Sequence, residues 1–193
     1  MEPADAETDV PAEPDPELWR KAAGGDRSAF GELFERHVQA VWNHAYRLTG
    51  SWSLAEDIAS IAFLTAWRRR TEITLARDSA LPWLYAVVGN LARAEQRRSI
   101  RFRLAVRRLP VAGVDHDHAD AVAGRVSDDQ RLRVVLDAVR GLPRSERQVV
   151  ELCLIGGVST ADAAVALGIG EASVRSRISR ARGRLRAVVM EES

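Results

Sequence analysis

Apolar side chains recur at helical spacing along most of this 193-residue chain, and no strand-like alternation of useful length occurs. The first clear pattern ends at Gly50, which is placed to terminate a helix. Its apolar residues share one face: Phe30, Phe34, Val41, Ala45 and Leu48. Comparable patterns predict further helices over residues 53–67, from residue 82 into an arginine cluster, and over residues 131–141, 145–156, 161–167 and 171–188. The sequence therefore predicts an all-α fold.

The formal net charge of +1 hides a strong asymmetry along the chain. Residues 93–108 carry seven arginines against one glutamate, and residues 171–186 carry six arginines against one glutamate. Two concentrated basic segments in a nearly neutral chain indicate two contacts with a polyanion. The alternative is a pair of solvated helix faces that bind nothing.

Two segments without a helical apolar period divide the chain. Residues 1–16 hold six acids, four prolines and no base, which predicts a disordered acidic tail. Residues 109–130 are small and acidic, which predicts a flexible linker between one small helical domain at 17–108 and a second at 131–193. Residues 115–118 of this linker (Asp-His-Asp-His) are possible metal ligands, but adjacent residues of a flexible strand cannot surround one ion. We therefore expect no metal site.

Composition argues against several classes of protein. Cys153 is the single cysteine, so no internal disulfide can form and a reducing compartment is indicated. There is no run of about 18 apolar residues, and the N-terminus is acidic where a secretory signal is basic, so we expect a cytoplasmic protein without membrane insertion. No paired carboxylates, Ser/His/Asp set or phosphate-cradling glycine loop is visible, which predicts a non-enzyme without a cofactor. We expect His37 to be a hydrogen-bonded core histidine and Cys153 a buried structural thiol.

Two serines match the capping-box pattern that opens helices: Ser53 with Glu56, and Ser145 with Gln148. The helix expected after Ser53 is apolar on two sides, with Leu54, Ile58 and Ile61 on one and Phe63 and Trp67 nearly opposite. A helix that is apolar all round is either deeply buried or docked against a second surface. In so small a domain, docking is the better interpretation.

A helix-turn-helix is indicated near the C-terminus. Ser159 is placed to cap a short helix, residues 168–170 (Gly-Ile-Gly) supply a tight turn, and a longer helix follows from Glu171. One narrow face of the longer helix is expected to pack on the domain: Val174, Ile178, Ala181 and Leu185. The opposite face is expected to read base edges and holds Arg175, Ser176, Ser179, Arg180 and Gly183. The flanks are expected to hold phosphates and carry Arg177, Arg182 and Arg184.

Three stretches of the chain, taken in order, resemble the extracytoplasmic-function (ECF) group of the sigma-70 family. Residues 48–58 (LTGSWSLAEDI) with 62–68 (AFLTAWR) look like the second sigma region. Residues 82–90 (PWLYAVVGN), followed by Arg97 and Arg98, look like its promoter-melting end. Residues 142–150 (LPRSERQVV) with 174–182 (VRSRISRAR) look like the fourth sigma region. The three in this order, across a variable acidic linker, are highly specific for the family.

The resemblance implies partners and a docking helix. In the family, the helix matching the one with Asp57 docks on the clamp of core RNA polymerase. Ser60 and Ile61 stand where the family usually has Gln and an acid. Core RNA polymerase, promoter DNA and an anti-sigma factor are the implied partners.

The resemblance also implies two promoter contacts. In the family, the residue matching Asn90 and the loop matching residues 71–80 hold a flipped base of the −10 element. Trp83 lies seven residues before Asn90 and therefore on the same helix face, as a surface for single-stranded DNA requires. Arg97 and Arg98 are expected to complete this contact. The positions that read the −35 element match Arg175, Ser176, Ser179 and Arg180, which helical periodicity selects independently.

A competing interpretation is a stand-alone helix-turn-helix regulator that binds operators without polymerase, because the helix-turn-helix alone does not separate the two classes. The sigma interpretation predicts weak promoter binding by the free protein, since the acidic tail and linker oppose DNA binding by like charge. It predicts tight and specific binding once core polymerase is present.

Overall fold

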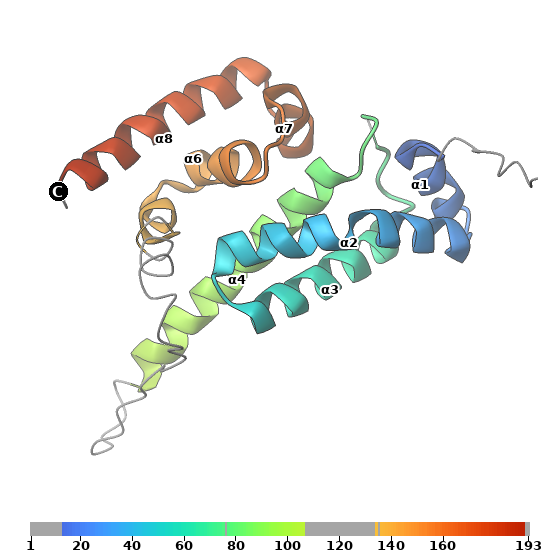
Figure 1. Cartoon of the computed structure of the whole chain (residues 1–193), viewed down its shortest axis with the longest axis horizontal. Helices are drawn as coiled ribbons and strands as arrows, with labels where there is room; N and C mark the ends of the chain where they lie inside the picture. The colour runs from blue at the N-terminus through green and yellow to red at the C-terminus, as the bar shows by residue number, and fades with distance from the viewer. Residues whose placement is uncertain (1–12, 76, 107–133, 135, 192–193) are drawn as a thin grey trace, which may run out of the picture.

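The structure, a computed structural model, describes residues 13–75, 77–106, 134 and 136–191. Within these residues every regular element is helical, which confirms the predicted all-α fold (Figure 1). The elements are α1 (Asp15–Ala23), α2 (Arg27–Thr49), α3 (Trp52–Arg69), α4 (Leu81–Val106), α6 (Arg144–Val149), the π-helix η1 (Val150–Ile155), α7 (Thr160–Leu167) and α8 (Glu171–Glu191). Residues 136–141 are also helical. The expected linker at 109–130, with its Asp-His run, lies outside the described residues.

The expected end of α2 is confirmed, but two expected helix starts are wrong. Gly50 ends α2 in the left-handed conformation, with φ 68°. The next residue, Ser51, is already extended and caps α3 by accepting a hydrogen bond from Leu54 N at 3.4 Å, so Ser53 lies inside the helix. Helix α6 begins directly after Pro143 and has no side-chain cap, so Ser145 does not form the expected capping box.

The folded chain begins earlier than the expected boundary at residue 17. Helix α1 starts at Asp15, whose carboxylate is buried and accepts hydrogen bonds from Arg36 Nη1 at 2.7 Å and from Ala80 N at 2.8 Å. His37 Nε2 lies 2.5 Å from the same carboxylate, so the expected hydrogen-bonded core histidine is confirmed. Prolines are tolerated in the first turn of a helix, which is why a proline-rich, acidic composition concealed this one. Residues 1–12 of the expected tail lie outside the described residues.

Helices α1 to α4, called here the N-terminal group, pack around one core. Helices α2, α3 and α4 lie side by side and α1 crosses one end of them (Figure 1). Phe34 meets Phe63 and Phe30 meets Trp67 in edge-to-face contacts, with ring centroids 4.8 and 5.1 Å apart.

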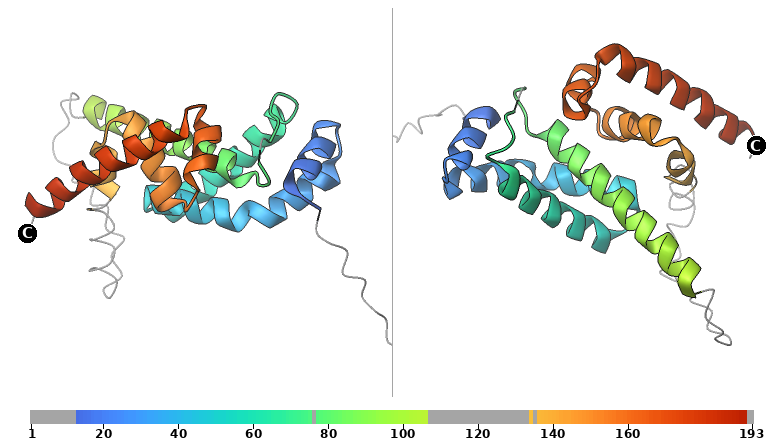
Figure 2. Two further views of the ribbon diagram at one scale, coloured as in Figure 1. Left: turned by 90° about the horizontal axis from the view of Figure 1, so that it is seen from above. Right: turned by 180° about the vertical axis from the view of Figure 1, so that it is seen from behind.

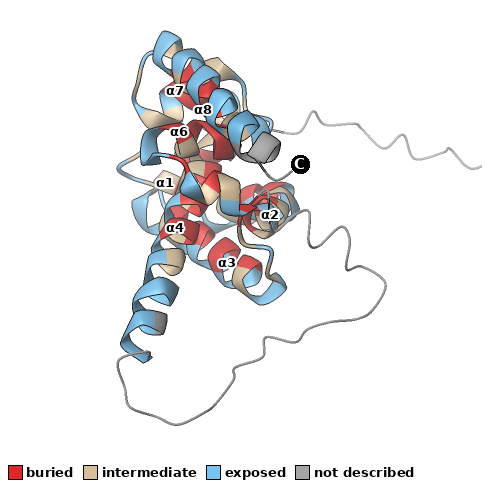
Figure 3. Cartoon of the chain, turned by 90° about the vertical axis from the view of Figure 1, so that its left-hand side faces the viewer, coloured by how far each residue is buried: buried red, intermediate tan, exposed pale blue. Residues whose placement is uncertain are grey.

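The helical residues 136–141 together with α6, η1, α7 and α8, called here the C-terminal group, pack against α4 and α2 (Figure 2). One core cluster contains residues of both groups, among them Val88 and Leu152, and buried positions continue from one group into the other (Figure 3). The backbone of Gly156 lies close against the Tyr85 side chain of α4: a Cβ atom placed on Gly156 would lie 2.9 Å from the Tyr85 ring. The two groups are therefore in direct contact.

Candidate nucleic-acid and polymerase interfaces

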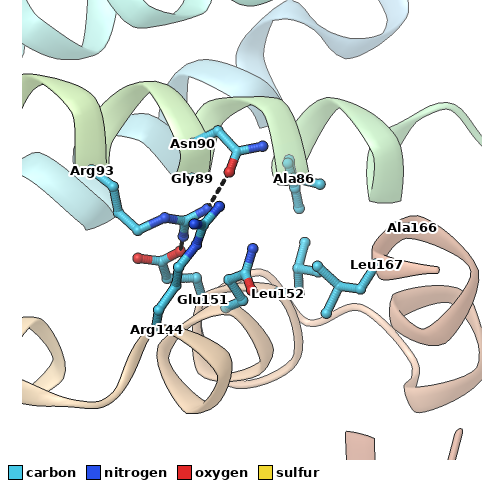
Figure 4. Close-up of a pocket in the computed structure, with 11 residues that line it drawn as sticks. Ala86, Gly89, Asn90, Arg93, Arg144, Glu151, Leu152, Ala166 and Leu167 are labelled. Atoms are coloured by element: carbon cyan, nitrogen blue, oxygen red, sulfur yellow. Dashed lines mark hydrogen bonds and ion pairs between the residues drawn. The ribbon is translucent and has the colours of Figure 1, made fainter. Parts of the chain in front are cut away.

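Helix α4 presents Trp83 and Asn90 toward the C-terminal group. Pro82 occupies the first turn of α4, as expected, and Trp83 packs edge-on against Trp19 with ring centroids 5.6 Å apart. Asn90 is exposed and borders a hollow of about 230 Å³ that is also lined by Ala166 and Leu167 of α7 (Figure 4). Trp83 borders a second hollow that also includes Ala166. One face of α4 therefore carries both residues, and α7 lies over it.

A buried ionic cluster, formed by Arg93 and Glu151 with the partly buried Arg147, joins α4 to the C-terminal group and contacts the exposed Asn90. Arg93 Nη1 forms an ion pair with Glu151 Oε2, and Arg93 Nη2 donates to Asn90 Oδ1 at 2.6 Å (Figure 4). Arg147 Nε donates to the other oxygen of Glu151 at 2.8 Å. Burial raises the pKa of Glu151 and lowers the pKa of Arg93, although the opposite charges counteract both shifts. The cluster therefore holds Asn90 and fixes the contact between the two groups.

Further polar contacts cross between the groups. Arg47 Nη1 donates to the carbonyl of Ile155 at 3.3 Å, and Arg140 Nη2 donates to the carbonyl of Thr49 at 3.3 Å. Arg77 forms a 3.1 Å ion pair with Asp162 of α7. The contact thus combines an apolar centre with charged groups at its edge.

The expected helix-turn-helix is present as α7, Gly168 and α8. Ser159 caps α7 by accepting from Asp162 N at 3.0 Å, and Gly168 turns the chain with φ 64°. Thr160 Oγ1 donates to Glu171 Oε1 at 2.8 Å, which ties the start of α7 to the start of α8. The predicted packing face of α8 is confirmed, because Val174, Ile178 and Ala181 are buried and Leu185 is half-buried.

The arginines of α8 fall on two flanks, a grouping that differs from the one expected. The outermost positions are small and exposed: Ser176, Ser179 and Gly183. Arg175 lines the same shallow hollow as Arg182, beside Thr160, and also pairs with Glu171 at 2.6 Å. Arg180 and Arg184 lie on the other flank, where both contact Glu146 of α6. Arg177 is half-buried.

Helix α3 exposes an apolar strip on its outer side. Ile61 and Leu64 are 46% and 45% exposed, although both are large hydrophobic residues. Asp57 and Ser60 lie on the same side and are exposed. The three residues predicted to dock on the clamp therefore share one accessible surface with Leu64.

The two arginines expected near the −10 contact lie farther along α4. Arg97 and Arg98 are both exposed, and Arg98 is within 3.7 Å of Glu95. The structure therefore brings Trp83 and Asn90 together under α7, while the two arginines extend beyond that contact.

The sequence analysis did not predict three buried charged residues: Arg93, Glu146 and Glu151. Arg93 belongs to the basic segment at residues 93–108, and nothing in the helical pattern marks Glu146. Glu151 interrupts an otherwise apolar run at Val149–Ile155, and a charge in such a run is a signal that could have been used.

Taken together, these features define a class: a helical protein with a basic helix-turn-helix, as in DNA-binding proteins, and a second helical group that carries an exposed apolar strip. The family models agree with this class. Residues 33–102 match "Sigma-70 region 2", and residues 132–185 match "Sigma-70, region 4".

Curated relatives identify the family more narrowly. The ECF RNA polymerase sigma factor SigL of Mycobacterium tuberculosis is 31% identical over 174 residues, which cover 88% of this chain and 94% of SigL. The ECF RNA polymerase sigma factor BldN of Streptomyces coelicolor is 31% identical over 83% of this chain and 60% of BldN. The chain belongs to the ECF group of the sigma-70 family and is an alternative sigma factor, which binds core RNA polymerase and directs promoter-specific initiation.

Solved structures share the fold. CnrH, in a complex with the cytosolic domain of CnrY, is 27% identical, with a TM-score of 0.63 over 93% of this chain and 99% of CnrH. RpoE of Bartonella quintana, in a complex with the anti-sigma factor NepR, has the same fold, with a TM-score of 0.55 and 20% identity. Among the described helices of this chain, none is long and apolar enough to cross a bilayer.

Proposed function

We propose that three surfaces divide the work of initiation: α8 reads the −35 element, one face of α4 captures the −10 element, and the outer strip of α3 docks on core polymerase. The observation that carries the proposal is the composition of α8. Its buried side packs on the scaffold, its outermost residues are small, and arginines stand on both flanks. A helix of this kind can enter a major groove closely while its flanking cations reach guanine edges and phosphates.

For the −35 element, the proposed base-reading residues are Arg175, Ser176, Ser179 and Arg180, and the proposed phosphate contacts are Arg177, Arg182 and Arg184. The placement of arginines on two flanks supports a helix that touches both walls of the groove. Phosphate contacts supply affinity, and base contacts supply the preference for one sequence.

For the −10 element, the proposed residues are Trp83, Asn90, Arg97 and Arg98. An exposed amide can replace the hydrogen bonds that a flipped base loses, and a neighbouring aromatic ring can support a base by stacking. In the arrangement described above, Arg93 holds Asn90 and α7 covers its face of α4. Because Arg93 already occupies the Asn90 amide oxygen and α7 borders the same face, we expect a base to gain full access only when the two groups separate, which supports weak promoter binding by the free protein.

For polymerase, the proposed contacts are Asp57, Ser60 and Ile61, extended by Leu64. An apolar strip in water favours burial against a partner, and Asp57 adds a charged rim that can fix the register of docking. The expected domain division also remains part of the proposal, with region 2 as the docking and −10 unit and region 4 as the −35 unit.

We further infer that the protein acts by binding alone, in the cytoplasm, and that an anti-sigma factor controls it. CnrH was solved with the cytosolic domain of CnrY and RpoE with the anti-sigma factor NepR, and both share the fold of this chain. A regulator that covers the α3 strip would compete directly with polymerase.

The decisive experiment is promoter-directed transcription with purified core polymerase and an Ile61→Lys variant. The wild-type protein should co-purify with core enzyme and start transcripts at a defined site. Ile61→Lys should lose most of this association yet unfold like wild type, because the side chain is already half exposed. Tight, specific operator binding by the protein alone, without polymerase association, would favour the stand-alone regulator instead.

A further inference from the structure

Glu146 is a buried carboxylate that faces two arginines of the proposed −35 helix. It lies in the first turn of α6 and is 5% exposed. Its Oε1 lies 3.6 Å from Arg180 Nε, and its Oε2 lies 3.1 Å from Arg184 Nε. The two arginines are one helical turn apart, so a single carboxylate on the supporting helix reaches both.

An acidic side chain in the first turn of α6 is stabilised by the helix dipole, but that interaction does not require the two arginines of α8. Oε2 of Glu146 accepts no hydrogen bond from the described residues, so the neighbouring charge of Arg184 is its compensation. Removing a carboxylate from water is costly, and a buried ion pair is often no more stabilising than an apolar pair of similar volume. A buried acid in this position therefore indicates a role in placing its partners.

The geometry leaves both arginines able to bind a second acceptor. Each contacts Glu146 through Nε, which lies on the side edge of the guanidinium. The edge formed by Nη1 and Nη2 can still bind a guanine or a phosphate with two parallel hydrogen bonds. More than half of each arginine side chain remains exposed, at 58% and 60%.

We propose that Glu146 is a positioning residue for −35 recognition: it holds Arg180 in the orientation that discriminates between DNA sequences, and it holds Arg184 beside it for a phosphate contact. The inference rests on the proposed function of α8. Without Glu146 the two long side chains would sample many rotamers and could satisfy any nearby phosphate. Sequence preference would fall, while affinity for DNA in general would rise because a negative charge near the DNA surface is lost.

The test is Glu146→Gln in the holoenzyme, measured on promoters with the correct and with altered −35 elements at several salt concentrations. The ratio of affinities for correct over altered elements should fall about threefold or more, and binding to altered elements should strengthen about twofold. A residue with only a structural role would instead lower binding to every sequence and lower the melting temperature. Glu146→Asp retains the negative charge but its shorter side chain no longer reaches both arginines. It should therefore lower the preference for the correct −35 element without strengthening binding to altered elements.

Glu171→Gln is the matched control. Glu171 pairs with Arg175 in the first turn of the same helix, so the variant removes an equal charge from the other flank. It should alter general affinity and the preference at the bases that Arg175 reads, but leave unchanged the preference at the bases that Arg180 reads. In an Arg180→Ala/Arg184→Ala background, Glu146→Gln should have no further effect on preference.

The outcomes separate two failures. If Arg180→Ala and Arg184→Ala leave −35 binding unchanged, the assignment of these arginines fails and the role of Glu146 fails with it. If Arg180→Ala lowers preference but neither Glu146→Gln nor Glu146→Asp does, only the positioning role is overturned. Equal effects of Glu146→Gln and Glu171→Gln on preference at the bases that Arg180 reads would also overturn it.

Discussion

Glu151→Gln tests whether the buried ionic cluster keeps the −10 face of α4 covered. The side chains of Glu151 and Arg93 are only 4% and 7% exposed, so solvent screens their interaction very little. Removing one partner of such a pair costs about 3–5 kcal/mol, and an amide that retains some hydrogen bonds favours the lower end of this range. Because the Arg93–Glu151 ion pair joins α4 to η1, the variant weakens the contact between the N-terminal and C-terminal groups by this free energy.

A loss of about 3 kcal/mol converts to a change of about 100-fold in the population of separated groups. The assay is the binding of a labelled single-stranded −10 oligonucleotide to the free protein, followed by fluorescence anisotropy. The variant should bind more tightly than wild type, with about 100-fold as the upper limit. Urea unfolding of the same proteins should show a lower free energy of unfolding for the variant.

Glu95→Gln controls for the change of charge, because Glu95 lies on α4 beside Arg98 and outside the cluster. The double variant Arg93→Met/Glu151→Leu should recover part of the lost stability, because it removes both charges of the Arg93–Glu151 pair, while Arg147 loses its contact with Glu151. If Glu151→Gln binds the oligonucleotide no better than Glu95→Gln, the cluster does not keep the α4 face covered.

Two further variants test separate parts of the structure. Asn90→Ala should impair promoter opening by about 1–3 kcal/mol, and transcription should largely recover on a template already melted across the −10 bases; absence of a defect on both templates would exclude base capture. His44 stacks on Tyr85 without a hydrogen-bonding partner among the described residues, and burial, aided by Arg47, lowers its pKa from 6.5 to about 4. The unfolded state therefore binds the proton first as pH falls, so stability should be complete above pH 6.5 and decline by about 3 kcal/mol toward pH 4. His44→Phe retains the stack and should remove this decline in urea unfolding across the same window; an unchanged decline would assign it to other groups.

Local physics explains which parts of the fold were predictable. The helix end at Gly50, the Ser159 cap and the packing face at Val174 and Ile178 depend on neighbours in sequence, and all were predicted correctly. The predicted helix start at Ser53 was wrong because two nearby serines can cap this helix. Ser51, which directly follows the end of α2 at Gly50, is the residue that caps α3.

The missed features depend on distant partners. Asp15 becomes a helix start because Arg36, His37 and Ala80 surround its carboxylate, and those residues lie 21 to 65 positions away. Arg93 and Glu151 are separated by 58 positions, so no periodicity on either helix reveals the pair. Contacts of α8 with Glu146, on another helix, group Arg180 with Arg184, and a helical wheel of α8 alone contains no information on that partner.

The position of Cys153 in η1 has a practical consequence for spectroscopy. All five tryptophans precede residue 84, whereas the single cysteine lies in the C-terminal group. Tryptophan fluorescence therefore reports on the N-terminal group, and a dye coupled to Cys153 reports on the C-terminal group. Energy transfer from the tryptophans to the dye should fall when the two groups separate, and no cysteine has to be engineered for labelling. The thiol is half-buried and burial raises its pKa, so its rate of alkylation in the unmodified protein gives a second signal that should increase when the groups part.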